Sequence, residues 1–199
     1  MEQYPVPYQV AMIQMASDFL NRKENLAKAE GYIRMAAANG AKLICLPESF
    51  DVGYISTRIP EMMAAAENEQ GETVLFMKAL AKELGVHILA PAFWKSQDGA
   101  VENRAYLIDD EGTLLGSYAK THPVGDERTL LQRGTQYRVF DTKLGKIGIT
   151  ICYDVCFPET SRLLALNGGR FCWFPRPGEE ISILKSGGIS ICAAAPSIT

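Results

Sequence analysis

The feature that most constrains this chain is an apolar, β-branched run that ends abruptly in a cysteine. Residues 148–154 read GITICYD, and a helix-like segment begins just beyond them with the sequence FPE at residues 157–159. This pattern predicts a buried strand that holds the backbone and a sharp turn that lifts the thiol of Cys152 into a cleft. Because a lone cysteine is more often a buried apolar side chain, the prediction of a nucleophile depends on the rest of the chain.

Two further strand-like runs end in charged residues. Residues 43–46 read LICL and lead through a proline to Glu48, and residues 117–119 read SYA and lead to Lys120. A carboxylate can take the proton of a thiol, and an ammonium group can stabilise the oxyanion that forms when the thiol attacks a carbonyl group. Together with Cys152, these residues supply a base, a cation and a thiol, which suffice for acyl transfer.

Three motifs, in chain order, carry a resemblance to a known family. They are LPE at residues 46–48, KTH at residues 120–122 and CYDVCFPE at residues 152–159. With each motif placed after a strand-like run, the chain resembles the nitrilase superfamily, the carbon–nitrogen hydrolases, from about residue 8 to residue 168. The resemblance implies an α/β fold, the nitrilase-like αββα sandwich, with its C-terminal part incomplete. It also implies pairing of the subunit into a homodimer or a higher homo-oligomer.

The resemblance further implies a Glu-Lys-Cys triad and a role for each member. Cys152 would attack the substrate carbonyl, and Glu48 would act as the base and later pass the proton to the leaving amine. Lys120 would hold the oxyanion, with the backbone N–H of Tyr153 as the second donor. The implied reaction is hydrolysis of a small linear amide or carbamoyl compound through a cysteine thioester, without a metal or an organic cofactor.

Less specific matches surround the triad. Many relatives place a second glutamate after the lysine strand, and Glu127 is the candidate for this fourth role, in which it would position the substrate or Lys120. Tyr54 and His122 are candidates for contact with the substrate. His122 would also be a rival base, as in papain-like enzymes, although no companion Asn or Asp motif supports that pairing. Asp154 is expected to organise the turn after the nucleophile through hydrogen bonds.

The hydrophobic pattern predicts alternating strands and helices. A capping-box-like arrangement of Asn21 and Glu24 opens a helix between strands at residues 8–14 and 42–46, so the two strands form a parallel β-α-β unit. Glycine and turn signals predict two antiparallel hairpins farther on. The remaining predicted elements are a helix at 71–84, a strand at 86–93, hairpin strands at 104–108 and 113–119 and at 137–141 and 146–151, and a helix at 157–166.

Composition and charge exclude several classes of protein. The chain has 199 residues, of which 47% are hydrophobic, and this fits one soluble globular domain. A net charge of −3 gives no reason to expect nucleic acid or an anionic membrane as a partner. The N-terminus does not look like a signal peptide, and no apolar run approaches the roughly 20 residues that span a bilayer. Neither a dinucleotide-binding nor a Walker motif is present, so a nucleotide cofactor is not indicated.

The cysteines indicate the compartment. Five cysteines scattered through apolar segments fit a reducing environment better than a disulfide framework, so we expect a cytoplasmic protein. Cys152 and Cys156 have a C-x3-C spacing, but with only two histidines in the chain a zinc site is poorly supported. A redox-sensing pair of these two thiols is an alternative function, and the presence of Glu48 and Lys120 counts against it.

The last part of the chain departs from the family pattern. Residues 1–168 are predicted to form a partial carbon–nitrogen hydrolase domain, whereas amphipathic order is lost over residues 169–199. A shifted reading frame over residues 170–178 permits a strand like the one that the family places there. We therefore hypothesise a frameshifted or truncated product with an atypical, poorly ordered tail. The alternatives are an inactive remnant or interaction-only protein and, within the family, a nitrilase that acts on a nitrile.

Overall fold

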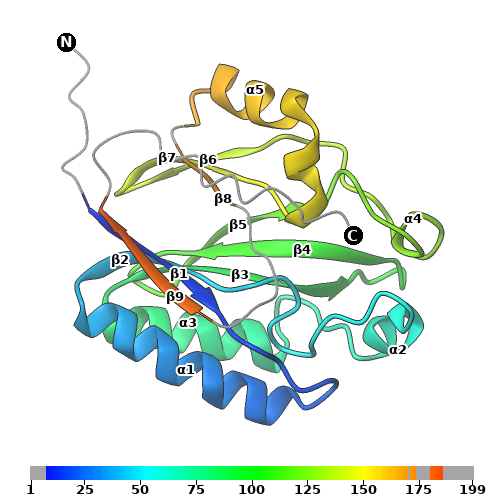
Figure 1. Cartoon of the computed structure of the whole chain (residues 1–199), viewed down its shortest axis with the longest axis horizontal. Coiled ribbons are helices and arrows are strands. Elements are labelled where there is room, and N and C mark those ends of the chain that lie inside the picture. Colours follow the sequence, from blue (N-terminus) through cyan, green and yellow to red (C-terminus); the bar gives the residue numbers. More distant parts are fainter. Residues whose placement is uncertain (1–7, 170, 174–179, 186–199) are drawn as a thin grey trace.

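The elements of the protein stack in layers. The computed structural model describes residues 8–169, 171–173 and 180–185. Helices α1 and α3 cover one side of a large sheet, a smaller sheet packs on its other side, and α5 lies outermost (Figure 1). This is the αββα sandwich that the family resemblance implies. The helices span Arg22–Ala38 (α1), Ile59–Ala64 (α2), Glu72–Leu84 (α3), Glu127–Leu130 (α4) and Pro158–Leu166 (α5).

The larger sheet has six strands in the order β5-β4-β3-β2-β1-β9. Strands β1, β2 and β3 run parallel, whereas β3-β4, β4-β5 and β1-β9 pair antiparallel. The predicted β-α-β unit and the hairpin of β4 and β5 are therefore confirmed. Since β2 and β5 run in the same direction, their carboxyl ends lie at one edge of the sheet. The strands are Gln9–Gln14 (β1), Ala41–Cys45 (β2), His87–Lys95 (β3), Val101–Ile108 (β4), Leu114–Ala119 (β5) and Glu180–Lys185 (β9).

The smaller sheet has the order β6-β7-β8, with Val139–Thr142 and Gly145–Ile149 as an antiparallel hairpin and Phe171–Trp173 parallel to β7. The predicted hairpin is confirmed, but β7 ends sooner than expected, because a 3-10 turn, η1, occupies Cys152–Cys156. Strands β8 and β9 belong to the predicted tail of residues 169–199, and most of the other residues of that tail lie outside the described residues.

Helix α1 begins and ends where the pattern predicts, but its first turn is held differently. Asn21 occupies the N-cap position without a side-chain hydrogen bond, so the predicted capping box is wrong. Instead, Asn25 binds the backbone of Asp18 through both its amide oxygen and its amide nitrogen, at 2.7 and 2.8 Å. The helix stops at Gly40, whose φ of +90° suits a residue without a Cβ.

The two largest hydrophobic cores of the described residues hold the layers together, and the strands contribute alternate residues to them. In β2, Ile44 packs with α1 and α3, whereas Leu43 and Cys45 face the smaller sheet. Strand β7 closes the second core with Ile147 and Ile149. Strands β2 and β7 both contribute side chains to this second core, which lies between the sheets. The residues that follow the two strands are therefore close together.

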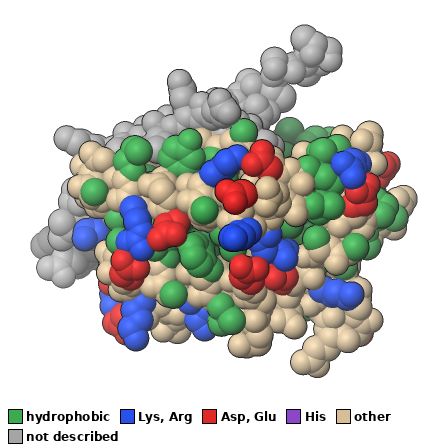
Figure 2. All heavy atoms as spheres, turned by 90° about the horizontal axis from the view of Figure 1, so that it is seen from below, with side chains coloured by type: hydrophobic (Ala, Val, Ile, Leu, Met, Phe, Trp, Pro, Cys, Tyr) green, Lys and Arg blue, Asp and Glu red, His purple; other side chains and the backbone are tan. Residues whose placement is uncertain are grey.

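The face over α1 and α3 carries acidic and basic side chains interspersed (Figure 2). Arg34 on α1 joins the two helices there by donating to Glu83 at 2.6 Å and to Glu30 at 2.8 Å. This mixture agrees with the small net charge, since no single sign dominates the face. No helix in the described part of the chain is both long enough and apolar enough to cross a membrane.

Candidate active site

The ends of three strands meet between the two sheets. Glu48 lies just beyond β2, Lys120 directly follows β5, and Cys152 lies just beyond β7. Glu48 and Lys120 are 3% and 2% exposed, so both charges are withdrawn from water. A buried ammonium group or carboxylate requires a partner of opposite charge. Glu48 and Lys120 are such partners, because they form an ion pair with each other.

The Lys120 ammonium group bridges two carboxylates. Its Nζ donates to Oε1 of Glu48 at 2.8 Å and to Oε2 of Glu127 at 2.9 Å. Burial lowers the pKa of Lys120, but the charges of Glu48 and Glu127 outweigh this effect, so the pKa lies above its ordinary value. Lys120 therefore stays a cation at the pH of the cell.

Glu127, the predicted fourth member, is completely buried at the start of α4. Its Oε2 also accepts the backbone N–H of Val124 at 3.0 Å, which fixes the carboxylate against its own loop. The structure thus brings Glu127 to Lys120. We refer to Glu48, Lys120, Glu127 and Cys152 as the Glu-Lys-Glu-Cys cluster.

Cys152 sits on a strained turn. Its φ is +45°, a left-handed conformation that is uncommon for a residue with a side chain and that recurs where a nucleophile is presented between a strand and a helix. Burial is the main cause that raises the pKa of the Cys152 thiol to about 12, the negative charge of Glu48 adds to it, and Lys120 partly opposes it. The thiol therefore carries its proton at neutral pH, and the negative charge of Glu48 helps to keep it there.

Asn103, on β4, belongs to the site and escaped the sequence analysis. Its Nδ2 donates to Oε1 of Glu48 at 2.7 Å and to Oε1 of Glu127 at 3.1 Å, and the residue is 2% exposed. The amide thus ties the two carboxylates together. Asparagine is unfavourable in a strand, and the predicted strand at 104–108 begins just after Asn103, whereas β4 begins at Val101 and contains it.

Asp154 is the hydrogen-bond centre of the turn after the nucleophile, as the sequence analysis expected. Its buried carboxylate accepts from the hydroxyl of Tyr118 at 2.8 Å, from the hydroxyl of Thr121 at 3.0 Å and from the backbone N–H of Ile151 at 3.0 Å. These bonds join β5, the loop after Lys120 and η1. Asp154 thereby sets the position of Cys152 relative to Lys120.

His122 has the acidic partner that its sequence surroundings did not reveal. Its Nδ1 lies 2.8 Å from Oδ1 of Asp154, and its ring stacks on Phe157 with 3.8 Å between the ring centroids. The absence of a companion motif was therefore a misleading argument against His122. No hydrogen bond between His122 and Cys152 is present among the described residues, and the charged groups that shift the pKa of the thiol are Glu48, Lys120 and Glu127.

A comparison with known proteins decides the family. The model of the carbon–nitrogen hydrolase family matches residues 9–183. The chain belongs to this family. It is 38% identical over 161 residues to a nitrilase of Pyrococcus abyssi, covering 80% of this chain and 61% of the relative. It is 37% identical over 158 residues to the N-carbamoylputrescine amidase of Solanum lycopersicum, covering 76% of this chain and 52% of the relative.

A comparison with solved structures supports the same family assignment. The protein is similar, with a TM-score of 0.75 and 25% identity, to a variant of the amidase from Nesterenkonia sp., covering 85% of this chain and 64% of that one. In that structure the acetamide moiety of fluoroacetamide is added covalently to the active-site cysteine. Measured against these family members, the chain spans only about half to two thirds of their length.

Tyr54 lies on the Glu48 side of the site. Together with Ser17, Pro47 and Glu48 it lines a cavity of about 340 Å³. Burial, and then the negative charges of Glu127 and Glu48, raise the pKa of the Tyr54 hydroxyl above its ordinary value. The hydroxyl therefore stays protonated beside the carboxylates, which is compatible with the predicted contact to substrate.

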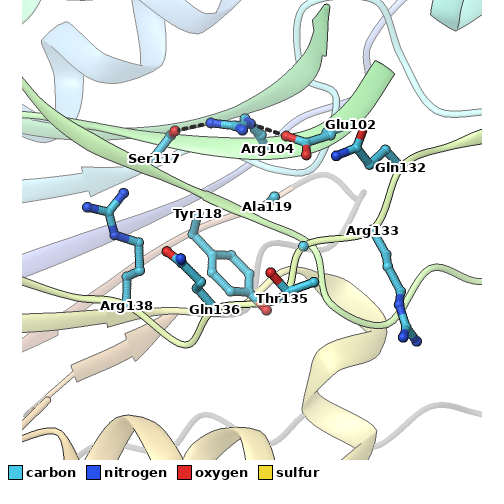
Figure 3. Close-up of a pocket in the computed structure, with 11 residues that line it drawn as sticks. Glu102, Arg104, Ser117, Tyr118, Ala119, Gln132, Arg133, Thr135, Gln136 and Arg138 are labelled. Carbon is cyan, nitrogen blue, oxygen red and sulfur yellow. Dashed lines mark hydrogen bonds and ion pairs between the residues drawn. The ribbon is translucent and has the colours of Figure 1, made fainter. Parts of the chain in front are cut away.

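Another pocket, of about 260 Å³, lies between β4, β5 and residues 132–138 (Figure 3). In it, Arg104 donates to Glu102 and, at 2.8 Å, to Oγ of Ser117. No member of the Glu-Lys-Glu-Cys cluster lines this pocket, so we assign it no part in the chemistry. Nowhere in the described residues do three His, Cys, Asp or Glu side chains gather in a way that could hold a metal ion.

Proposed function

We propose that the protein is an amidase-type carbon–nitrogen hydrolase that cleaves a small linear amide or carbamoyl compound through a thioester on Cys152. The observation that carries the proposal is the buried network in which the Lys120 ammonium group lies 2.8 Å from Glu48 and 2.9 Å from Glu127, with the thiol of Cys152 under the influence of the same charges. A neutral thiol needs a base at the moment of attack. Glu48 is the base within reach of the thiol.

The first half of the reaction forms the thioester. The sulfur of Cys152 attacks the carbonyl carbon while Glu48 takes the thiol proton. The oxyanion that develops on the former carbonyl oxygen is stabilised by the Lys120 ammonium group and, in our proposal, by the backbone N–H of Tyr153. When the carbon–nitrogen bond breaks, Glu48 returns the proton to the nitrogen, and ammonia or an amine leaves.

The second half releases the product. Water attacks the thioester carbon, Glu48 takes a proton from the water, and the oxyanion forms again beside Lys120. The carbon–sulfur bond then breaks, the carboxylic acid or carbamate leaves, and the sulfur regains a proton. Glu127 and Asn103 act as positioning residues, because they hold Lys120 and the Glu48 carboxylate in place through both halves.

The amidase named above supports a cysteine nucleophile, since its active-site cysteine forms a covalent adduct. Relatives named as an amidase and as a nitrilase both match the chain, so hydrolysis of a nitrile is the second candidate. The same thiol can attack a nitrile carbon while the same base takes its proton. The two candidates are distinguished by substrate rather than by geometry.

The test is release of ammonia from a panel that contains butyramide, a carbamoyl amine and butyronitrile. We expect ammonia from the amide or the carbamoyl compound, and Cys152→Ala should lower the rate at least about 1,000-fold. Cys156→Ala is the matched control, because this free cysteine of the same turn is exposed and should leave the rate unchanged. A cooperatively folded wild-type chain that neither turns over the panel nor forms a cysteine adduct with fluoroacetamide would favour the inactive remnant.

A cytoplasmic location and assembly with a second copy of the chain complete the proposal. Both were implied by the sequence, the first by cysteine usage and the second by the family resemblance. Measurement of the molar mass in solution tests the assembly, and a single monomeric species would contradict it.

A further inference from the structure

The loop that carries Glu48 has a strained backbone. It follows β2, and Glu48, Gly53 and Tyr54 of this loop line the cavity of about 340 Å³. Ser49, directly after Glu48, has a φ of +52°, a left-handed conformation that is uncommon for a residue with a side chain. Such a conformation costs free energy and persists only where the surrounding contacts hold it. The position of the Glu48 carboxylate therefore depends on the groups that anchor this loop.

The backbone of the loop is anchored to the segment between β1 and α1 and to α1 itself. Oγ of Ser17 donates to the carbonyl of Phe50 at 2.7 Å. Nδ2 of Asn25, in the first turns of α1, donates to the carbonyl of Asp51 at 2.9 Å. Neither of these two bonds reaches α3, so they hold the loop from one direction.

The side chain of Asp51 adds a closed ring of contacts that reaches α3 as well. Its Oδ2 accepts from the hydroxyl of Thr73 at 3.3 Å and lies 3.5 Å from Nη2 of Arg22. Nη1 of Arg22 lies 3.1 Å from Oε1 of Glu67, and Oε2 of Glu67 accepts the backbone N–H of Thr73 at 3.0 Å. We call these four residues the Asp51 ring. The ring joins the loop to α1 and α3, the two helices that cover the larger sheet (Figure 1).

The charges of the Asp51 ring are unbalanced, because two carboxylates face one guanidinium group. Asp51 and Thr73 are each 2% exposed, and Oδ1 of Asp51 has no hydrogen-bond partner among the described residues. Burial raises the pKa of Asp51 to about 6, Arg22 opposes this effect, and Glu67 adds to it. On β4, Tyr106 faces the same carboxylate: burial is the main cause that raises the pKa of its hydroxyl, and the charge of Asp51 is a smaller one. A buried carboxylate of this kind lowers stability, a cost that is typical of functional sites.

We propose that Asp51 is a positioning residue for the hydrolase reaction: its ionised carboxylate holds the strained loop in the conformation that places Glu48 beside Lys120. Protonation of Asp51 removes its ion pair with Arg22, so Ser49 relaxes and the Glu48 carboxylate moves from its place. The inference rests on the proposed function and adds to it a group that does not touch the substrate.

The test compares kcat of the wild type and of Asp51→Asn from pH 5 to pH 7.5. Asparagine keeps the shape of the side chain but carries no charge, so it imitates the protonated aspartate. We expect the ratio of kcat, wild type over variant, to rise from below about 2 at pH 5 to about 10 at pH 7.5, with KM unchanged, because a small displacement of a catalytic group slows the chemical step. The titration of Glu48 itself cancels in this ratio. A merely structural role predicts no such rise, since removal of the buried charge should make the fold more stable at pH 7.

A second variant and a control test the ring. Because Arg22 lowers the pKa of Asp51, Arg22→Gln should move the rise of kcat to higher pH. Asp18→Asn is the matched control, since it removes an exposed carboxylate that pairs with Lys28 in the adjoining segment. Its kcat should equal that of the wild type at every pH.

Modification of Cys152 by fluoroacetamide, followed by mass spectrometry, gives a readout that does not need turnover. The thiol proton must leave the sulfur in this reaction too, so the ratio of the modification rates of wild type and Asp51→Asn should rise with pH in the same way. A ratio that stays constant between pH 5 and pH 7.5 in both measurements overturns the inference and leaves the hydrolase proposal intact. A folded wild-type chain with neither turnover nor an adduct counts against the hydrolase proposal and, with it, the inference.

Discussion

At the scale of single residues, one carboxylate oxygen of Glu48 accepts hydrogen bonds from two other residues of the site. Oε1 of Glu48 accepts from Lys120 at 2.8 Å and from Asn103 at 2.7 Å, and the negative charge of the same carboxylate raises the pKa of the Cys152 thiol. The raised pKa of this thiol distinguishes the site from a thiolate–imidazolium pair, in which the cation would lower the pKa of the cysteine. Because the thiol is protonated before the reaction, its proton has to move to a base as the sulfur attacks the substrate.

Replacement of the base tests this reading. Glu48→Gln keeps the shape of the side chain but removes its ability to take the thiol proton, so we expect kcat to fall about 100- to 10,000-fold. Glu159→Gln, an exposed glutamate at the start of α5, is the control and should keep full activity. Steady-state rates and a thermal melt of each variant separate loss of chemistry from loss of fold. Retained activity in Glu48→Gln together with its loss in His122→Asn would assign the base to the histidine.

At the scale of elements, the loop that carries Glu48 is anchored by a buried carboxylate. Asp51 is 2% exposed, and its Oδ2 accepts from Thr73 of α3 at 3.3 Å and lies 3.5 Å from Arg22 of α1. Burial raises the pKa of Asp51 to about 6, although Arg22 opposes this effect. An unfolded aspartate titrates near 3.9, so between about pH 4 and pH 6 the folded state binds more protons than the unfolded state.

This difference predicts a pH dependence of stability. Where the folded state binds more protons, the free energy of unfolding falls as pH rises, and a shift of about two units corresponds to about 3 kcal/mol. Asp51→Asn should abolish this decline between pH 4 and pH 6 and raise the stability at pH 7 by up to about 3 kcal/mol. Urea unfolding at several pH values measures both effects. Asp18→Asn, which removes an exposed ion pair with Lys28, is the control and should change stability by less than about 1 kcal/mol.

At the scale of the whole molecule, the site depends on the distance between the two sheets. Gly116 of β5 faces Phe140 of β6, and a Cβ on the glycine would lie 2.6 Å from the ring. Tyr118, two residues along the same strand, reaches across to Asp154 at 2.8 Å. Since Lys120 follows β5 and Cys152 follows β7, any separation of the sheets also separates these two groups.

A methyl group at this contact should therefore weaken both the fold and the site. We expect Gly116→Ala to lower the free energy of unfolding by about 2–4 kcal/mol, because it combines overpacking with a φ of +153° that disfavours alanine. Gly99→Ala is the matched control, since Gly99 also has a positive φ but open space around it, and it should cost about 1 kcal/mol. Equal losses in the two variants, measured by urea unfolding, would show that backbone strain alone is responsible.

Local pattern was sufficient to predict much of this protein. Apolar periodicity located the β-α-β unit, α3 and the two hairpins, since each depends on residues near one another in the chain. Motif order located Glu48, Lys120 and Cys152 as candidates, because strand ends present side chains at the edge of a sheet, and the family resemblance added Glu127. The α/β class and the family resemblance also follow from the sequence.

The contacts among these residues depend on the packing of distant parts of the chain. Asn103 and Glu48 are 55 residues apart, and Asp154 and His122 are 32 residues apart, so no local pattern could reveal their hydrogen bonds. The protonated thiol of Cys152 likewise depends on burial between two sheets, which is a property of packing. The order of residues along the chain thus defines which acidic, basic and thiol groups are available. The packing of the two sheets defines which of them lie together, because hydrogen bonds and desolvation act only over a few ångströms.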